Sequence, residues 1–261
     1  MNRSFQQPYN FPTKNGEDGD SLLWASLLHA SGEDHIDGIL ACQDESGRFW
    51  RSPARVKNDV KNSFSKDMAT GLILAAMADS LMYDKSYIVN ALQRWIDFVV
   101  SNRYQAFPSS DATDGRAIMT PAIFWAASYA GANVPTWLKA TRSLLYPYLY
   151  IAAMFNKPGY TLHLVGVSLF TIQMTHGNWF TNKIAKVLYK RQSKNPFFAY
   201  LAGDYTAAAD MTYKYYINSL YNNQGSRHQW GWEREDDEKA WKDSCGHDFV
   251  FISNLIKLTV K

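Results

Sequence analysis

Carboxyl side chains recur where long polar segments lead into apolar helical segments. These acids are Asp18, Asp20, Asp67, Asp111, Asp114, Glu233 and Asp236. Two carboxyl groups that face one reacting bond can divide its acid–base work, provided that one is protonated and the other ionised. The hypothesis that follows makes Glu233 the general acid and Asp67 or Asp20 the base or nucleophile.

The segment HQWGWERED offers an aromatic surface next to its first acid. Trp230 and Trp232 flank a single glycine, and Glu233 follows directly. Two indoles at this spacing can stack on flat sugar faces, and an apolar wall raises the pKa of a neighbouring carboxyl. In the alternative interpretation the two indoles anchor a long loop in the core, and Glu233 pairs with Arg234 or Lys239 in solvent.

The segment GRFWRS repeats the theme with Arg48, Trp50 and Arg51. Guanidinium forks beside an aromatic ring suit carboxylates or acidic sugars. Structural arginines explain the same residues equally well. The further candidates for substrate contacts are Asp18, Asp114 and His247.

Helix capping is the competing explanation for the acids. Ser65 is expected to cap the helix that begins at residue 66, and Asp67 then stands at the positive end of its dipole. Asp20 is expected to cap the first helix, with or without a role in a cleft. Capping and chemistry therefore stay open for both acids.

Helical periodicity dominates the chain, whereas alternation typical of strands hardly appears. The expected helices cover residues 20–32, 33–43, 65–81, 85–102, 119–131, 134–155, 160–177, 178–192, 195–204, 205–223 and 246–258, with a short turn at 236–243. Pro147 is expected to bend or break its helix. Residues 1–19 are expected to be extended. About twelve helices would pair into six hairpins.

Short connections alternate with long ones rich in Trp and Arg, and antiparallel helices would gather the long ones at one end. No Pro-, Gly- or Ser-rich linker divides the chain, so residues 1–261 are expected to form a single domain. The expected fold is all-α, with the hairpins arranged in a ring. An irregular bundle and a solenoid are the alternatives.

This arrangement resembles the (α/α)6 toroid of six-hairpin glycosidases and polysaccharide lyases. EDGDSLLWASLLHAS is similar to the acidic segment that opens a helix in family-eight glycoside hydrolases, and NSFSKDMATGLILA is similar to inner-helix starts in such toroids. In the family-eight enzymes the two segments occur in the opposite order. The resemblance implies a glycoside hydrolase that cleaves a polysaccharide in an open cleft by paired carboxyl groups.

Two rival functions remain. A polysaccharide lyase acting on an acidic glycan would use His163 or His247 with Tyr160 for proton transfer and Arg48 or Arg51 to neutralise a carboxylate. A non-catalytic glycan-binding or virion structural module would keep the aromatic loops without turnover.

Composition excludes several other classes. The net charge of +3 and the absence of a basic run argue against nucleic acid as a partner. No apolar run has the length of a membrane span, and no signal peptide is visible, which predicts a soluble protein that is cytoplasmic, or released or virion-associated if phage-encoded. No zinc-peptidase, P-loop or serine-hydrolase motif occurs, so neither metal nor cofactor is expected. The sequence leaves the oligomeric state open.

Overall fold

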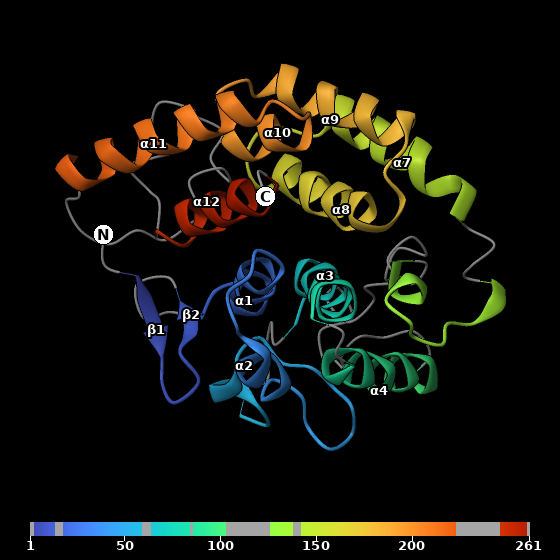
Figure 1. The fold of residues 1–261 in the computed structure, drawn as a ribbon. Helices are drawn as coiled ribbons and strands as arrows, with labels where there is room; N and C mark the ends of the chain where they lie inside the picture. Colours follow the sequence, from blue (N-terminus) through green and yellow to red (C-terminus); the bar gives the residue numbers. More distant parts are fainter. Residues whose placement is uncertain are drawn as a thin grey trace. The chain divides into compact units, whose positions relative to one another are not determined.

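The computed structural model describes residues 3–13, 18–58, 64–83, 86–102, 126–137, 142–222 and 246–259 (Figure 1). These residues are mostly helical, which confirms the all-α class. The helices are α1 (Ser21–Ala30), α2 (Ile36–Leu40), α3 (Lys66–Met82), α4 (Tyr87–Ser101), α7 (Arg142–Phe155), α8 (Tyr160–His176), α9 (Trp179–Arg191), α10 (Pro196–Leu201), α11 (Tyr205–Asn222) and α12 (His247–Thr259), with a 3-10 turn, η1 (Pro53–Arg55).

A small sheet precedes the helices. β1 (Ser4–Gln6) pairs with β2 (Phe11–Thr13). The two strands form a hairpin that alternation of residue types did not reveal.

The chain divides into two compact units. The C-terminal unit comprises Met1–Phe5, Thr13–Glu17 and Tyr146–Lys261, and the N-terminal unit comprises Gln6–Pro12 and Asp18–Leu145. The single domain expected from the sequence stays a prediction.

In the N-terminal unit, α1 and α3 are the inner helices. Every residue of α1 is buried, and so is α3 from Met68 to Asp79. A helix that is apolar on all sides must be covered on all sides. By contrast, α4 buries one stripe, which includes Trp95, and exposes the opposite face. Thus α4 is an outer helix that covers α3.

The two inner helices run parallel. Gly71 near the start of α3 lies against Leu23 near the start of α1: a Cβ at Gly71 would be 3.0 Å from the Leu23 Cα atom. At the other end, the Tyr83 hydroxyl donates to the carbonyl oxygen of His29 over 3.4 Å. Both helices therefore begin at the same end of the unit and present their positive dipole ends side by side.

The C-terminal unit follows a similar rule. Its inner helices α8, α10 and α12 meet in an aromatic cluster, in which the Phe197 ring centroid lies 6.1 Å from that of Phe170 and 5.5 Å from that of Phe251. His163 also packs on Phe197, and Gln173, ten residues later in α8, donates to the carbonyl oxygen of Leu201. This register makes α8 and α10 parallel. Helices α7, α9 and α11 lie along one side of α8 and α12 (Figure 1).

One expectation about α7 needs correction. Pro147 does not break its helix, because α7 runs through it from Arg142 to Phe155.

Among the helices that the structure describes, none is long and apolar enough to cross a membrane.

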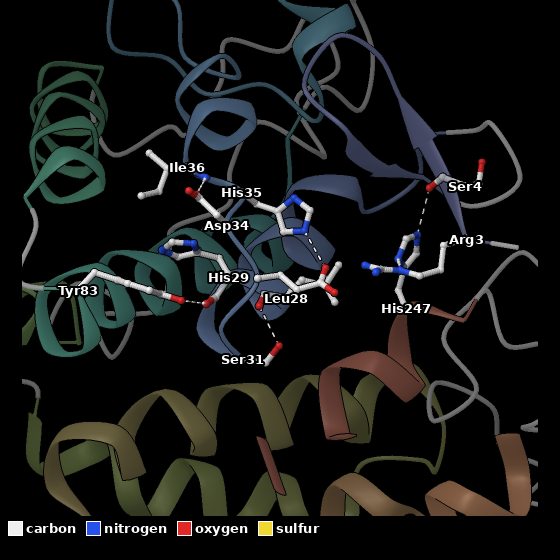
Figure 2. A network of polar contacts seen from close by, with 11 residues as sticks. Arg3, Ser4, Leu28, His29, Ser31, Asp34, His35, Ile36, Tyr83 and His247 are labelled. Atoms are coloured by element: carbon white, nitrogen blue, oxygen red, sulfur yellow. Dashed lines mark hydrogen bonds and ion pairs between the residues drawn. The ribbon is translucent and has the colours of Figure 1, made fainter. Parts of the chain in front are cut away.

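The far end of the α1–α3 pair holds a buried histidine. His29 is fully buried against the Tyr83 ring, and within the described ranges neither of its ring nitrogens has a hydrogen-bond partner (Figure 2). Burial lowers the pKa of His29, although the charge of Asp79 acts in the opposite direction. The folded state therefore favours the neutral imidazole.

We expect this histidine to weaken the fold in mild acid. Since the unfolded chain binds the proton with a pKa near 6.5, the free energy of unfolding should fall as the pH drops below about 6.5. The fall should be smaller in His29→Leu than in the wild type, as measured by urea unfolding at pH 7.5 and 5.5. An equal fall in His29→Leu and in the wild type would show that burial of His29 does not lower its pKa.

Candidate functional site

The start of α3 places Asp67 in the interior of the N-terminal unit. Ser65 caps this helix as expected, because its hydroxyl oxygen accepts from the Met68 amide over 3.4 Å. Asp67 is then the second residue of the helix and is partly buried. It neither caps the helix nor lies free in solvent.

The start of α1 brings Asp20 to the same end of the helix pair. Asp20 occupies the N-cap position, but its side chain makes no capping hydrogen bond. The expectation that its carboxylate caps α1 is therefore wrong. Only its carbonyl oxygen serves the helix, by accepting from the Trp24 amide over 3.1 Å. The Asp20 carboxylate is left for other contacts.

A clamp holds the segment before α3 against the start of α1. The Leu22 amide donates to the carbonyl oxygen of Arg51 over 3.2 Å. Nearby, Asp18 accepts from the Ser52 hydroxyl over 2.9 Å and pairs with the guanidinium of Arg55, whose Nη2 lies 2.6 Å from Oδ1. Asp18 thus holds the segment with Ser52 and Arg55 in place, and its carboxylate is not free for catalysis. The clamp fixes the backbone of Arg51 at the start of α1.

These contacts give Asp67 an unusual environment. Burial raises the pKa of Asp67 to about 6, and the negative charge of Asp20 adds to the rise. Lys66 and Arg51 act in the opposite direction. Burial and Asp20 thus outweigh both Lys66 and the helix dipole, which favour the ionised carboxylate.

Magnitudes explain this result. A helix N-terminus stabilises a carboxylate by about 0.3 to 1 kcal/mol, which is less than one pKa unit. The rise from 3.8 to about 6 corresponds to about 3 kcal/mol in the opposite direction. Asp67 is therefore a carboxyl that gives up its proton near neutral pH, held next to a second carboxylate and a guanidinium. Such a group can act as a general acid.

The three candidate residues of GRFWRS have different roles in the structure. Trp50 is only 4% exposed and donates from its indole nitrogen to Asp44 over 3.0 Å. The guanidinium carbon of Arg48 lies 3.8 Å from the ring centroid of Trp50. A sugar has no free ring face to stack on here, so the structural interpretation holds for this pair. Of the three, Arg51 is the residue whose positive charge acts on Asp67.

Two histidines of the C-terminal unit are core residues. His247 is fully buried at the start of α12, where its Nδ1 atom accepts from Arg3 over 2.9 Å and its Nε2 atom lies 3.1 Å from the Ser4 carbonyl oxygen (Figure 2). Burial lowers the pKa of His163 to about 3. Neither ring reaches solvent, which weakens their assignment as proton-transfer or substrate groups, whereas Tyr160 is exposed.

Several predicted residues lie outside the described residues. They are Asp111, Asp114, Trp230, Trp232, Glu233 and Asp236, together with the short turn at 236–243. Their roles stay predictions from the sequence.

The described part of the chain adds two further facts about possible ligands. No group of three or more His, Cys, Asp or Glu residues within it could hold a metal ion. An open hollow of about 730 Å³ lies on α4, between Gln93, Asp97 and Ser101 and the segment 133–135. It lies at the helix that covers α3 and does not involve the paired acids.

Comparison with known protein families, with curated proteins and with solved structures gave no match. No family is therefore assigned to this chain.

Sequence reasoning missed the clamp residues Ser52 and Arg55. Their partner Asp18 was singled out, but as a substrate contact. The signal was weak, since a serine, a proline and an arginine after GRFW are typical of an ordinary loop. Pairing Asp18 with Arg55 requires a contact across 37 residues, which no local pattern reveals.

Proposed function

We propose that this protein cleaves a carbohydrate polymer by acid–base chemistry, with Asp67 as the protonated general acid and Asp20 as its carboxylate partner. One observation carries the proposal: a carboxyl with a pKa raised to about 6 lies beside a second acid where two parallel inner helices begin. Glycosidic cleavage needs such a pair, one carboxyl protonated and one ionised. Structural acids rarely need to be poised near neutral pH.

The proposed steps follow from this difference in protonation. Asp67 donates its proton to the glycosidic oxygen as the bond to the anomeric carbon breaks. The Asp20 carboxylate stabilises the positive charge that develops on the sugar, either by direct attack or by activating a water. The roles differ from the sequence-based hypothesis, in which Asp67 was the base. Glu233 keeps a candidate role as a further carboxyl, with Trp230 and Trp232 as a sugar-stacking surface.

The (α/α)6 toroid is part of the same proposal. Within each unit, buried helices that run parallel alternate along the chain with helices that cover them, as α1 and α3 do with α4. Successive inner helices of a toroid have this relation, because each hairpin returns the chain to its starting end. The alternation supports a ring over an irregular bundle.

Lyase chemistry on an acidic glycan is the second candidate. The positive charges of Arg51 and Lys66 both lower the pKa of Asp67. The backbone of Arg51 is held by the Leu22 amide, and its guanidinium can neutralise a uronate carboxylate. The described histidines offer little to this mechanism, so Asp67 or Asp20 would have to remove the proton.

We expect turnover on at least one member of a panel of neutral and acidic bacterial polysaccharides. Reducing ends report hydrolysis, and absorbance of unsaturated uronates reports elimination. Asp67→Asn and Asp20→Asn should each lower kcat by a factor of about 100 or more, because general acid–base groups contribute factors of about 10² to 10⁴. Asp37→Asn, an exposed acid at the second residue of α2, is the matched control and should retain full activity.

Two other outcomes would favour the lyase or the glycan-binding module. Unsaturated products that depend on Arg51 would move the protein to the lyases. Binding of a polymer without any cleavage, unaffected by Asp67→Asn, would make it a recognition module and refute the acid–base role.

A further inference from the structure

One face of α7 exposes a row of large apolar side chains. Tyr148, Ile151 and Phe155 are 54%, 57% and 74% exposed, and Met154 beside them is 42% exposed. Their spacing of three and four residues puts them on one face of the helix. The opposite face, which includes Leu149 and Ala153, is buried. The helix is therefore apolar on both sides, although only one side is covered by the unit to which these residues belong.

This row of side chains, called the α7 face, carries no charge. No Asp, Glu, Lys or Arg occurs between Arg142 and Lys157. A surface helix in water normally places charged residues on its outer side. A partner for this face must accordingly be apolar, and neither an acidic nor a basic partner finds a complement here.

The α7 face is its own complement. If a second α7 packs antiparallel about a two-fold axis near Ile151, each Phe155 meets the Tyr148 of the other copy and the two Ile151 side chains meet at the axis. Aromatic rings in such pairs add attraction beyond their buried area. A two-fold interface uses the same patch on both subunits, so a helical row that is symmetric about its own centre fits it.

Neighbouring residues extend the α7 face toward α9. Trp179 is 72% exposed, and the Lys183 ammonium lies 5.3 Å from the ring centroids of both Trp179 and Tyr150. With about 200 Å² for a fully exposed large side chain, the face and Trp179 together expose about 600 Å². Two copies would then bury about 1,200 Å², which lies within the size of specific protein interfaces.

We propose that the protein forms a symmetric homodimer in which α7 packs antiparallel on α7 of a second copy. An apolar patch of about 600 Å² is at the upper end of what a monomer exposes, and patches of this size are often interaction sites. The proposal is independent of the carbohydrate chemistry, since it involves neither α1 nor α3.

The first test measures the mass of the full chain in solution by light scattering and analytical ultracentrifugation. We expect a dimer, and Ile151→Glu should raise the dissociation constant at least about 30-fold, as expected for a central interface residue. Leu258→Glu, at an exposed leucine of α12, is the matched control and should leave the dimer intact. A wild-type monomer at micromolar concentration would overturn the proposal.

The second test determines whether the two α7 helices are antiparallel. Single cysteines are introduced and treated with a short thiol cross-linker, and the unaltered chain is treated in the same way as the control. Ile151→Cys should cross-link to itself across the axis. Phe155→Cys should not, because seven residues of helix separate the two copies of this position by about 10 Å along the axis. Self-cross-linking at both positions would indicate parallel helices and refute the antiparallel dimer.

A membrane surface is the competing partner. Sedimentation with phosphatidylcholine and phosphatidylserine vesicles separates the two. Vesicle binding that is lost in Ile151→Glu, together with a monomer in solution, would replace the homodimer with a lipid-facing helix.

Discussion

Replacing Asp67 with Asn should stabilise the fold at pH 8 by up to about 3 kcal/mol while it lowers kcat by a factor of about 100 or more. Holding the ionised carboxylate in its buried place beside Asp20 costs about 3 kcal/mol, given the rise of its pKa from 3.8 to about 6. Asn removes that cost, which is already the balance between burial and the favourable interaction of the carboxylate with the helix dipole. Catalytic groups often reduce stability in this way.

The gain should depend on pH with a definite sign. The folded state binds the Asp67 proton more tightly than the unfolded state, so the wild type gains stability relative to the variant as the pH falls through about 6. Below about pH 4 both states are protonated, and the advantage of Asn should vanish. Urea unfolding of the wild type and the variant at pH 4, 6 and 8 measures this difference.

Asp37→Asn separates the effect of burying a carboxyl from the effect of its place at a helix start. Asp37 is also the second residue of its helix, but it is exposed. Its replacement should only lose the dipole interaction and destabilise slightly at pH 8. If Asp67→Asn destabilised by a similar amount, Asp67 would be an ordinary acid at a helix start.

Replacing Gly71 with Leu should lower the free energy of unfolding by about 3 kcal/mol or more. The first side-chain carbon alone would lie 3.0 Å from the Leu23 Cα atom and 3.2 Å from the Ser26 Cβ atom. Helix propensity favours Leu over Gly by only about 1 kcal/mol, and overpacking of a core costs about 1 to 3 kcal/mol or more. The contact involves backbone, which cannot rotate away, so the packing cost should exceed the gain in propensity.

The same substitution should also alter the site. Any shift of α3 away from α1 separates Asp67 from Asp20, which should lower the pKa of Asp67 and with it the pH optimum of any activity. Ser80→Leu, on an exposed position of the same helix, serves as the control and should be tolerated. A fully stable Gly71→Leu protein would show that α1 and α3 do not approach as closely as the structure has them.

The sequence identified the elements of the site better than their roles. The cap at Ser65 and the apolar bodies of α1 and α3 follow from local rules, and both helices form where expected. Their parallel packing at Gly71 depends on a contact between residues 48 positions apart, which periodicity does not contain. The choice of Asp67 and Asp20 came from their places after long loops, and they do lie at one end of the helix pair.

What local rules could not supply was burial. The GRFWRS pattern fits a sugar-binding surface and a structural cluster equally well, yet Trp50 is buried under Arg48 and donates to Asp44. An indole in a polar segment looks the same in sequence whether its ring is covered or open. The pKa of Asp67 likewise depends on how much water its carboxyl loses, and only the packing of the whole unit determines that loss.

The most direct test of the proposed acid is a carbon-13 NMR titration of the Asp67 carboxyl, assigned by its loss in Asp67→Asn. We expect a pKa of about 6 in the wild type. We also expect a clear decrease in Asp20→Asn, which removes the neighbouring negative charge. A wild-type pKa near 4 that Asp20→Asn leaves unchanged would contradict the paired-carboxyl site and the acid–base function built on it.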